Sequence, residues 1–210
     1  MMNNYKTILI GGQAEIVEKK SRFIATVALV ESEDEATAFI AKIKKQNWNA
    51  THNCSAFIVG VRGETLRQSD DGEPSGTAGR PMLDVLQGAG LTNVAVVVTR
   101  YFGGTLLGTG GLVRAYSKAT QAGLAASEMV EKIWGARLSI KTDYNGVGKI
   151  QYLLGERRIP IIESTYTDNV QIEIILPQTD VEALIADLVE ATNGKVVIDE
   201  IEELYFDRPC

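Results

Sequence analysis

The feature that most constrains the fold is a segment, residues 70–118, in which glycines interrupt the chain at short intervals. Within residues 70–79, three glycines and a proline exclude both helix and strand. Residues 94–99 are instead a β-branched run, which is typical of a strand buried on both faces. Two glycine clusters, 103–104 and 108–111, then turn the chain before the next helix. Such loops let a backbone approach a partner closely, so this segment is the first place to seek a functional site.

The first half of the chain otherwise shows alternating and helical patterns. Ser32 and Glu35 form a capping box at the start of one helix. Residues 11–20 are interpreted as Gly11-Gly12 followed by a polar turn between two strands. The remaining predicted elements are strands at 5–10, 21–30, 49–61 and 64–69, and helices at 32–46, from Pro81 to Gly88 or Gly90, and at 110–127, the last capped by Thr105 or Thr109.

In the second half, the alternating and helical patterns of apolar residues predict the order βαββαβ. Its predicted elements are a strand at 136–142, a helix at 145–154, strands at 159–166 and 170–176, a helix from a capping box at Thr179 and Glu182 to Asn193, and a strand at 196–204. This order is the split βαβ, ferredoxin-like arrangement. Charged residues at 128–132 mark the boundary, so we expect an α+β protein with domains at 1–129 and 130–210.

Composition and charge narrow the class of protein. The chain has 210 residues and only two cysteines, Cys54 and Cys210, which predicts neither a disulfide framework nor a zinc site. The start of the chain lacks the pattern of a secretory signal, and no apolar run is long enough to cross a membrane. We therefore expect a cytoplasmic protein. Residues 1–127 carry a net charge of +2 and residues 128–210 one of −8, so any nucleic acid should bind the first half.

The glycine clusters suggest an anion site. Gly103 and Gly104, then Gly108, Gly110 and Gly111, precede a helix, whose free N–H groups attract anions. No Lys-Ser or Lys-Thr follows, which excludes a P-loop, and the third glycine of a dinucleotide fingerprint is missing. An alternative is that these glycines only build tight turns.

Three carboxylates within four residues, Asp70, Asp71 and Glu73, are the main catalytic candidates. They could hold a hard cation or divide acid and base roles. The alternative is that they cap turns or pair with arginines. The arginines in reach along the sequence are Arg80, Arg100 and Arg114.

His52, the single histidine, is a further catalytic candidate, although a lone histidine on a strand is more often a hydrogen-bonded structural residue than a ligand. Alternation places His52 and Cys54 on one face of a strand and Asn53 on the other. Cys54 is expected to be inert on an apolar strand. Ser75 lies in no nucleophile elbow.

Basic and aromatic residues close to the glycines resemble a nucleic-acid-binding set, in which cations position phosphates and aromatic rings stack on bases. The nearby acids weaken this signal. The candidate anion- and nucleic-acid-binding residues are Arg80, Arg100, Tyr101, Phe102, Gly103, Gly104, Gly108, Gly110, Gly111, Arg114 and Lys118.

Several of these segments together resemble the YigZ family, whose first domain is shared with the eukaryotic protein IMPACT. The matching segments are residues 20–24, 52–54, 70–79, 100–104 and 107–116. The resemblance implies a first domain with the ribosomal-protein type of β-α fold, also seen in the fourth domain of elongation factor G. It implies a ferredoxin-like second domain similar to the fifth domain of that factor. It also implies a link to regulation of translation, which IMPACT exerts through a stress-responsive kinase pathway.

Three hypotheses follow for the function. The leading one is a cytoplasmic, translation-associated binding protein whose first domain contacts RNA, a ribosomal surface or a nucleotide-like anion. The second is an enzyme that uses the carboxylates and arginines, and the third is a protein-interaction scaffold. We expect no resident cofactor, no bound metal and no membrane partner. The first two hypotheses require residues 70–79, 100–104 and 108–114 to converge on one recess.

Overall fold

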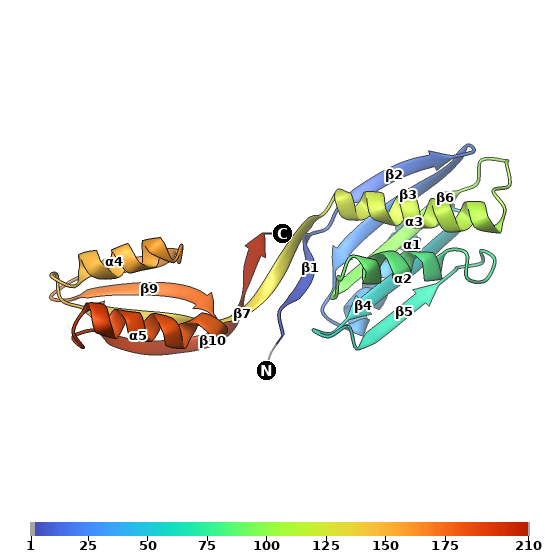
Figure 1. Ribbon diagram of the computed structural model, residues 1–210. Coiled ribbons are helices and arrows are strands. Elements are labelled where there is room, and N and C mark those ends of the chain that lie inside the picture. Colours follow the sequence, from blue (N-terminus) through green and yellow to red (C-terminus); the bar gives the residue numbers. More distant parts are fainter. Residues whose placement is uncertain (1–2, 210) are drawn as a thin grey trace. The chain divides into compact units, whose positions relative to one another are not determined.

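The computed structural model describes residues 3–209, which form two compact units. The N-terminal unit comprises residues 3–131 with the chain end from Arg208, and the C-terminal unit comprises residues 132–207. Each unit combines a β-sheet with helices, so the expectation of a mixed α+β fold is confirmed (Figure 1). The predictions that concern Met1, Met2 and Cys210 lie outside the described residues.

The N-terminal unit is built from six strands and three helices, with the first part of a seventh strand completing it. Its elements are β1 (Tyr5–Ile10), β2 (Gln13–Glu18), β3 (Ser21–Leu29), α1 (Glu33–Gln46), β4 (His52–Val59), β5 (Thr65–Ser69), α2 (Gly79–Gly88), β6 (Val94–Tyr101) and α3 (Thr109–Ala125).

The main sheet of this unit has the strand order β2-β3-β6-β4-β5, and all its neighbours are antiparallel. Helices α2 and α3 cover one face, and α1 covers the other. Strand β6 is central, and its residues from Val94 to Arg100 are buried. The β-branched run therefore marks a strand with a helix layer on each side, as the sequence predicted.

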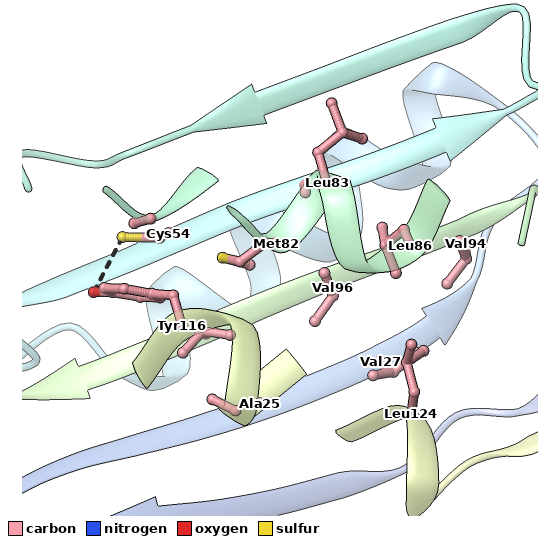
Figure 2. Close-up of a cluster of buried hydrophobic side chains, with 14 of the residues drawn as sticks. Ala25, Val27, Cys54, Met82, Leu83, Leu86, Val94, Val96, Tyr116 and Leu124 are labelled. Carbon is pink, nitrogen blue, oxygen red and sulfur yellow. Dashed lines mark hydrogen bonds between the residues drawn. The ribbon is translucent and has the colours of Figure 1, made fainter. Parts of the chain in front are cut away.

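The larger core of the unit lies between the sheet and α2 and α3. Figure 2 shows side chains from three strands meeting side chains from both helices. The labelled residues are Ala25 and Val27 of β3, Cys54 of β4, Val94 and Val96 of β6, Met82, Leu83 and Leu86 of α2, and Tyr116 and Leu124 of α3. A smaller core that includes Val30, Ala36 and Phe57 lies under α1.

Two sequence predictions for this unit are wrong. Residues 13–18 form strand β2 rather than a polar turn, and the turn to β3 is Lys19-Lys20, with φ angles of 44° and 69°. Helix α3 is not capped by a threonine, because its N-cap is Gly108, which makes no side-chain cap bond. Ser32, in contrast, accepts a hydrogen bond from the Glu35 amide at 3.1 Å, as its capping box predicted.

The C-terminal unit follows the order of elements that the sequence predicted. Its elements are β7 (Glu128–Thr142), α4 (Val147–Glu156), β8 (Ile161–Tyr166), β9 (Val170–Pro177), a 3-10 turn (Gln178–Asp180), α5 (Val181–Ala191) and β10 (Val197–Pro209). Strand β7 pairs with both β9 and β10, and β9 also pairs with β8. The charged residues 128–132 lie within β7.

The second predicted capping box does not form. Helix α5 has Asp180 at its N-cap without a side-chain cap bond, and the Thr179 hydroxyl donates to Asp180 Oδ1 at 3.0 Å. The 3-10 turn shifts the helix start past the threonine, so Thr179 lies outside the cap position. The buried residues of α5 are Val181, Leu184 and Leu188.

Within residues 3–209, no helix combines the length and the apolar composition needed to cross a bilayer.

Candidate functional site

The candidate residues lie at one end of the N-terminal sheet, where β4 begins and β6 ends. His52 and Arg100 are register partners on these two antiparallel strands. The loop between β5 and α2 and the loop between β6 and α3 both leave the sheet at this end, as does the β2–β3 turn (Figure 1). The fold therefore gathers segments that are up to about 100 residues apart in the sequence.

Asp70 organises the loop between β5 and α2. Its carboxylate accepts hydrogen bonds from the amides of Gly76, Ala78 and Gly79 at 2.9, 3.0 and 2.8 Å. Burial raises the pKa of this carboxyl, but the three amides outweigh that effect and hold the pKa below its usual value. Asp70 thus caps the start of α2 and fixes the loop.

Asp71 ties the same loop to α1 and β4. It accepts hydrogen bonds from Lys44 Nζ and from the Asn53 amide, both at 2.6 Å. Burial opposes ionisation here too, yet Lys44 and the Asn53 amide prevail and lower the pKa of Asp71. The Asp71 carbonyl lies 2.9 Å from His52 Nδ1, which must donate to it because a carbonyl only accepts.

Glu73 lies at the centre of a buried polar cluster. Its Oε1 accepts from Arg100 at 2.6 Å and from the Tyr116 hydroxyl at 2.7 Å, and its Oε2 lies 3.8 Å from His52 Nε2. The Glu73 side chain is only 3% exposed and that of Arg100 only 6%. Through these contacts, Glu73 links its loop to β6, to α3 and to the start of β4 beneath the surface.

Tyr116 and Cys54 complete this cluster on its inner side. Burial raises the pKa of the Tyr116 hydroxyl, which stays protonated and donates to Glu73. The Cys54 thiol lies 3.3 Å from the Tyr116 hydroxyl (Figure 2) and 3.0 Å from the Asp70 carbonyl. Burial raises the pKa of Cys54 to about 12, so the thiol is un-ionised at neutral pH.

Arg100 is enclosed by aromatic rings as well as by its ion pair. Its guanidinium carbon lies 5.4 Å from the ring centroid of Phe23 and 5.6 Å from that of Phe102. Ser21 Oγ is 3.4 Å from this guanidinium and also accepts from the Gly103 amide. The Nε atom of Arg100 is buried and has no hydrogen-bond partner among residues 3–209.

A separate cavity of about 260 Å³ lies beside the first turns of α3 and the β2–β3 turn. Arg114 and Lys118 are one helical turn apart on α3 and both are exposed, as is Lys19 of the turn. Within residues 3–209, none of these three cations forms an ion pair. The lining residues are Glu18, Lys19, Leu107, Gly111, Arg114, Ala115 and Lys118.

Gly103 allows the β2–β3 turn to pack against the β6–α3 loop. A Cβ atom at this position would lie 2.1 Å from the carbonyl carbon and oxygen of Lys20. Only glycine fits such an approach, which brings Lys19 to the start of α3. Gly104 and Gly108 have φ angles of 82° and 72°, so they turn the chain.

Three other predicted residues belong neither to the buried cluster around Glu73 nor to the cavity beside α3. Arg80 pairs with Asp84 on the surface of α2 at 2.8 Å. The Tyr101 hydroxyl donates to Asn47 Oδ1, and Arg22 lies over the Tyr101 ring. Gly110 lies on the first turn of α3.

The predicted set therefore separates into two parts. His52, Glu73 and Arg100 meet in the buried cluster, whereas Arg114, Lys118 and Gly111 line the exposed cavity. Within residues 3–209, no three His, Cys, Asp or Glu side chains gather in a way that could hold a metal ion.

Sequence reasoning missed three members of these clusters. Ser21 and Tyr116 belong to the buried cluster, and Lys19 belongs to the cavity. Tyr116 lies on the buried face of α3 together with Leu112, Ala115 and Ala119, and nothing in that apolar spacing distinguishes its hydroxyl. Lys19, Lys20 and Arg22 form a basic cluster in the sequence, but the spacing does not show that Lys19 lies next to α3.

Comparison with known families gives matches to both halves of the chain. Residues 19–124 match the family described as the Impact N-terminal domain. Residues 140–195 match a family described as a domain of unknown function, DUF1949.

Curated relatives match over most of the chain or over its first half. IMPACT family member YvyE of Bacillus subtilis is 44% identical over 208 residues, which cover 99% of this chain and 96% of that protein. IMPACT family member YigZ of Escherichia coli is 37% identical over 187 residues, which cover 88% and 92%. Protein IMPACT of Rattus norvegicus is 33% identical over 98 residues, which cover 45% and 31%.

Among solved structures, a crystal structure described as that of a hypothetical protein matches with a TM-score of 0.62 and 34% identity. The match covers 96% of this chain and 99% of the other.

Proposed function

The chain belongs to the YigZ/IMPACT family, and from this premise we propose that it is a cytoplasmic, translation-associated protein whose N-terminal unit binds RNA. The binding surface is the cavity beside α3, with Lys19, Arg114 and Lys118 as its phosphate contacts. The link to translation follows from the resemblance of the first domain to IMPACT.

The observation that carries the proposal is the set of three unpaired cations around one hollow. Cations that are free of ion pairs can exchange their counterions for phosphates without first breaking a salt bridge. Glu18 is the only acid among the residues that line this cavity. The start of α3 adds the partial positive charge of free backbone N–H groups, since Gly108 offers no side-chain cap.

Phe102 supplies an exposed aromatic side chain in the loop that leads from β6 to α3. It follows β6 directly and its side chain is about half exposed, at 47%. Exposed aromatic rings stack on unpaired bases with little sequence preference. A single-stranded RNA segment is therefore the form of ligand that suits this surface.

Arg100 has a different role from the one that a nucleic-acid interface requires. Its side chain is almost fully buried and its charge is neutralised by Glu73. The proposal therefore assigns phosphate binding to Lys19, Arg114 and Lys118 rather than to Arg100.

A more specific proposal concerns the folds of the two domains. In the C-terminal unit, β7 pairs with both β9 and β10, and β9 pairs with β8, which are the strand pairings expected of a ferredoxin-like βαββαβ domain. We propose that residues 1–129 form a domain like the fourth domain of elongation factor G, and that residues 130–210 form one like its fifth.

An enzyme acting through Glu73 has less support. Both oxygens of this carboxylate face protein groups, and the side chain is 3% exposed. A general base must reach the proton that it abstracts. The buried cluster is therefore better explained as the element that joins the loops of the site.

The test is RNA binding by fluorescence anisotropy at increasing salt. We expect wild-type affinity to fall as salt rises, and the double variant Arg114→Ala/Lys118→Ala to bind about tenfold more weakly. The slope of log affinity against log salt should decrease by roughly 0.7 for each lost contact to single-stranded RNA.

The matched control is Lys42→Ala/Lys45→Ala on α1. This pair also removes two exposed cations from a helix of the same unit, on the opposite face of the sheet. Its affinity should stay near that of the wild type. Salt-independent binding, absence of binding, or an equal loss in both double variants would refute the proposal.

A further inference from the structure

A second polar cavity lies in the C-terminal unit, between the turn that starts α4 and the turn that follows α5. Its volume is about 90 Å³, which suits a small ion rather than an organic molecule. Figure 1 shows the start of α4 and the end of α5 at the same end of this unit. The lining residues are Thr142, Asp143, Asn145, Gly146, Lys149, Thr192, Asn193 and Lys195.

Thr142 is the unusual residue of this cavity. The residue is 4% exposed, and its Oγ1 has no hydrogen-bond partner among residues 3–209. A Cβ atom on Gly146 would lie 2.2 Å from this oxygen, so the hydroxyl points at the first turn of α4. A buried hydroxyl without a partner costs free energy, and a ligand that accepts its proton would recover that cost.

The start of α4 offers further donors. Its N-cap is Gly146, which provides no side-chain acceptor, so the amides of Val147, Gly148 and Lys149 lack a cap. The Asp143 carboxylate is already engaged, because its Oδ1 accepts from the Gly146 amide at 2.8 Å. A helix start with uncapped amides favours an anion.

Two lysines give this cavity a positive charge in an otherwise acidic part of the chain. Lys149 Nζ donates to the Ala191 carbonyl at 3.0 Å, which holds it across the cavity between α4 and the end of α5. Lys195 is exposed and forms no ion pair within residues 3–209. Residues 128–210 carry a net charge of −8, so this local concentration of cations runs against the charge around it.

From these features we propose that the cavity binds a phosphate group, either as the free ion or as the terminal group of a phosphate monoester. Three donor side chains line this small volume, namely the Thr142 hydroxyl and the amines of Lys149 and Lys195. The uncapped amides at the start of α4 follow Gly146, which also lines it. A tetrahedral oxyanion has several acceptor oxygens for such donors, whereas chloride does not hold several directional donors equally well.

The test uses the full-length chain labelled with ¹⁵N. Inorganic phosphate is titrated against sodium chloride at matched ionic strength and pH, while the amide signals of residues 147–149 are followed. We expect saturable shifts with phosphate and none with chloride. A parallel titration with glycerol 3-phosphate separates the two sources, since tighter binding of the monoester would identify a terminal phosphate group as the ligand.

Two variants test the donors. Thr142→Val removes the hydroxyl at constant shape and should weaken phosphate binding at least about tenfold, without loss of thermal stability. Lys195→Gln changes an exposed side chain and should weaken binding about threefold. If Thr142→Val fails to fold, Lys195→Gln carries the test alone.

The matched controls lie in the same unit but outside the cavity. Thr165→Val removes an exposed hydroxyl on β8, and Arg158→Gln removes an exposed cation just past the opposite end of α4. Both should bind phosphate like the wild type. Shifts that do not saturate, equal shifts with chloride, or unchanged binding in Lys195→Gln would overturn the proposal.

Discussion

Glu73 receives hydrogen bonds from Arg100 and Tyr116, which lie 27 and 43 residues further along the chain. At the scale of single residues, this carboxylate holds the irregular loop between β5 and α2 against β6 and α3. Removing one partner of a buried ion pair leaves the other charge without compensation in a medium that solvates it poorly.

We therefore expect Glu73→Gln to lower the free energy of unfolding by about 3 kcal/mol, because Arg100 would stay buried and charged. Urea unfolding measures this change. Glu15→Gln is the control: it removes a carboxylate that pairs with Arg22 at a similar distance, 2.8 Å, but on the surface, and we expect little change. A loss in Glu73→Gln no larger than that of the control would contradict a stabilising role for the buried pair.

The sequence predicted which residues matter near the glycine loops better than it predicted their roles. Arg100 comes directly after the β-branched run in the sequence, and because a charge at the end of such a run is normally exposed, the sequence predicts a binding-surface residue. Its partner Glu73 lies in an irregular loop, where spacing gives no direction for a side chain. The register of β4 and β6 places Arg100 opposite His52, and a separate approach of 3.8 Å places the Glu73 carboxylate next to His52 Nε2.

At the scale of elements, the loop between β5 and α2 depends on the ionised form of Asp70. A carboxylate whose pKa is lowered in the folded state stabilises the fold fully above the pKa of the unfolded chain, about 3.9. That contribution is lost as the pH falls through the lower pKa of the folded state.

Asp70→Asn should therefore cost about 2 kcal/mol of stability at neutral pH, because three backbone amides lose a charged acceptor. The difference from the wild type should shrink as the pH drops below about 4, because Asp70 then takes up a proton first in the unfolded chain and, at still lower pH, in the folded protein. Denaturant unfolding at several pH values measures it. Asp84→Asn, which alters an exposed ion pair on α2, should cost less at neutral pH. A difference that stays constant or grows toward acid pH would show that the charge of Asp70 is not responsible.

The elements themselves were largely predictable, and the exceptions have physical reasons. The β-branched run predicted β6 because a strand with a helix layer on each face needs apolar side chains on both. Strand β2 was missed because its exposed side chains carry little apolar signal and its turn places two lysines, not glycines, at positive φ. The capping box at Thr179 failed because a 3-10 turn occupies the position that the pattern assigned to the helix.

At the scale of the whole molecule, the sequence motifs were sufficient to identify the YigZ/IMPACT family, which the comparisons confirm. The sequence suggested that three segments, residues 70–79, 100–104 and 108–114, converge on a single recess, but it could not show how their side chains are arranged. The structure divides those residues between a buried cluster and a cation-lined cavity. Sequence distance alone cannot distinguish residues that meet inside a protein from residues that share its surface.

The two units also have separate hydrophobic cores. The core beneath α2 and α3 is formed by residues 8–124, and the core of the C-terminal unit by residues 136–188, with no residue in common. A substitution that destabilises one core should therefore increase the population of locally opened states in that unit, without an equal increase in the other unit.

Hydrogen exchange measured by mass spectrometry tests this expectation in two variants of the full chain. In Glu73→Gln, amides of α2 and α3 should exchange up to about 100-fold faster, since about 3 kcal/mol corresponds to two powers of ten, while α4 and α5 should keep their rates. Leu184→Ala creates a cavity in the C-terminal core, and it should accelerate exchange in α4 and α5 but not in α2 and α3. If either variant accelerated exchange equally in both units, the chain would unfold as a single cooperative body, and the assignment of separate stabilities to the N-terminal and C-terminal units would be wrong.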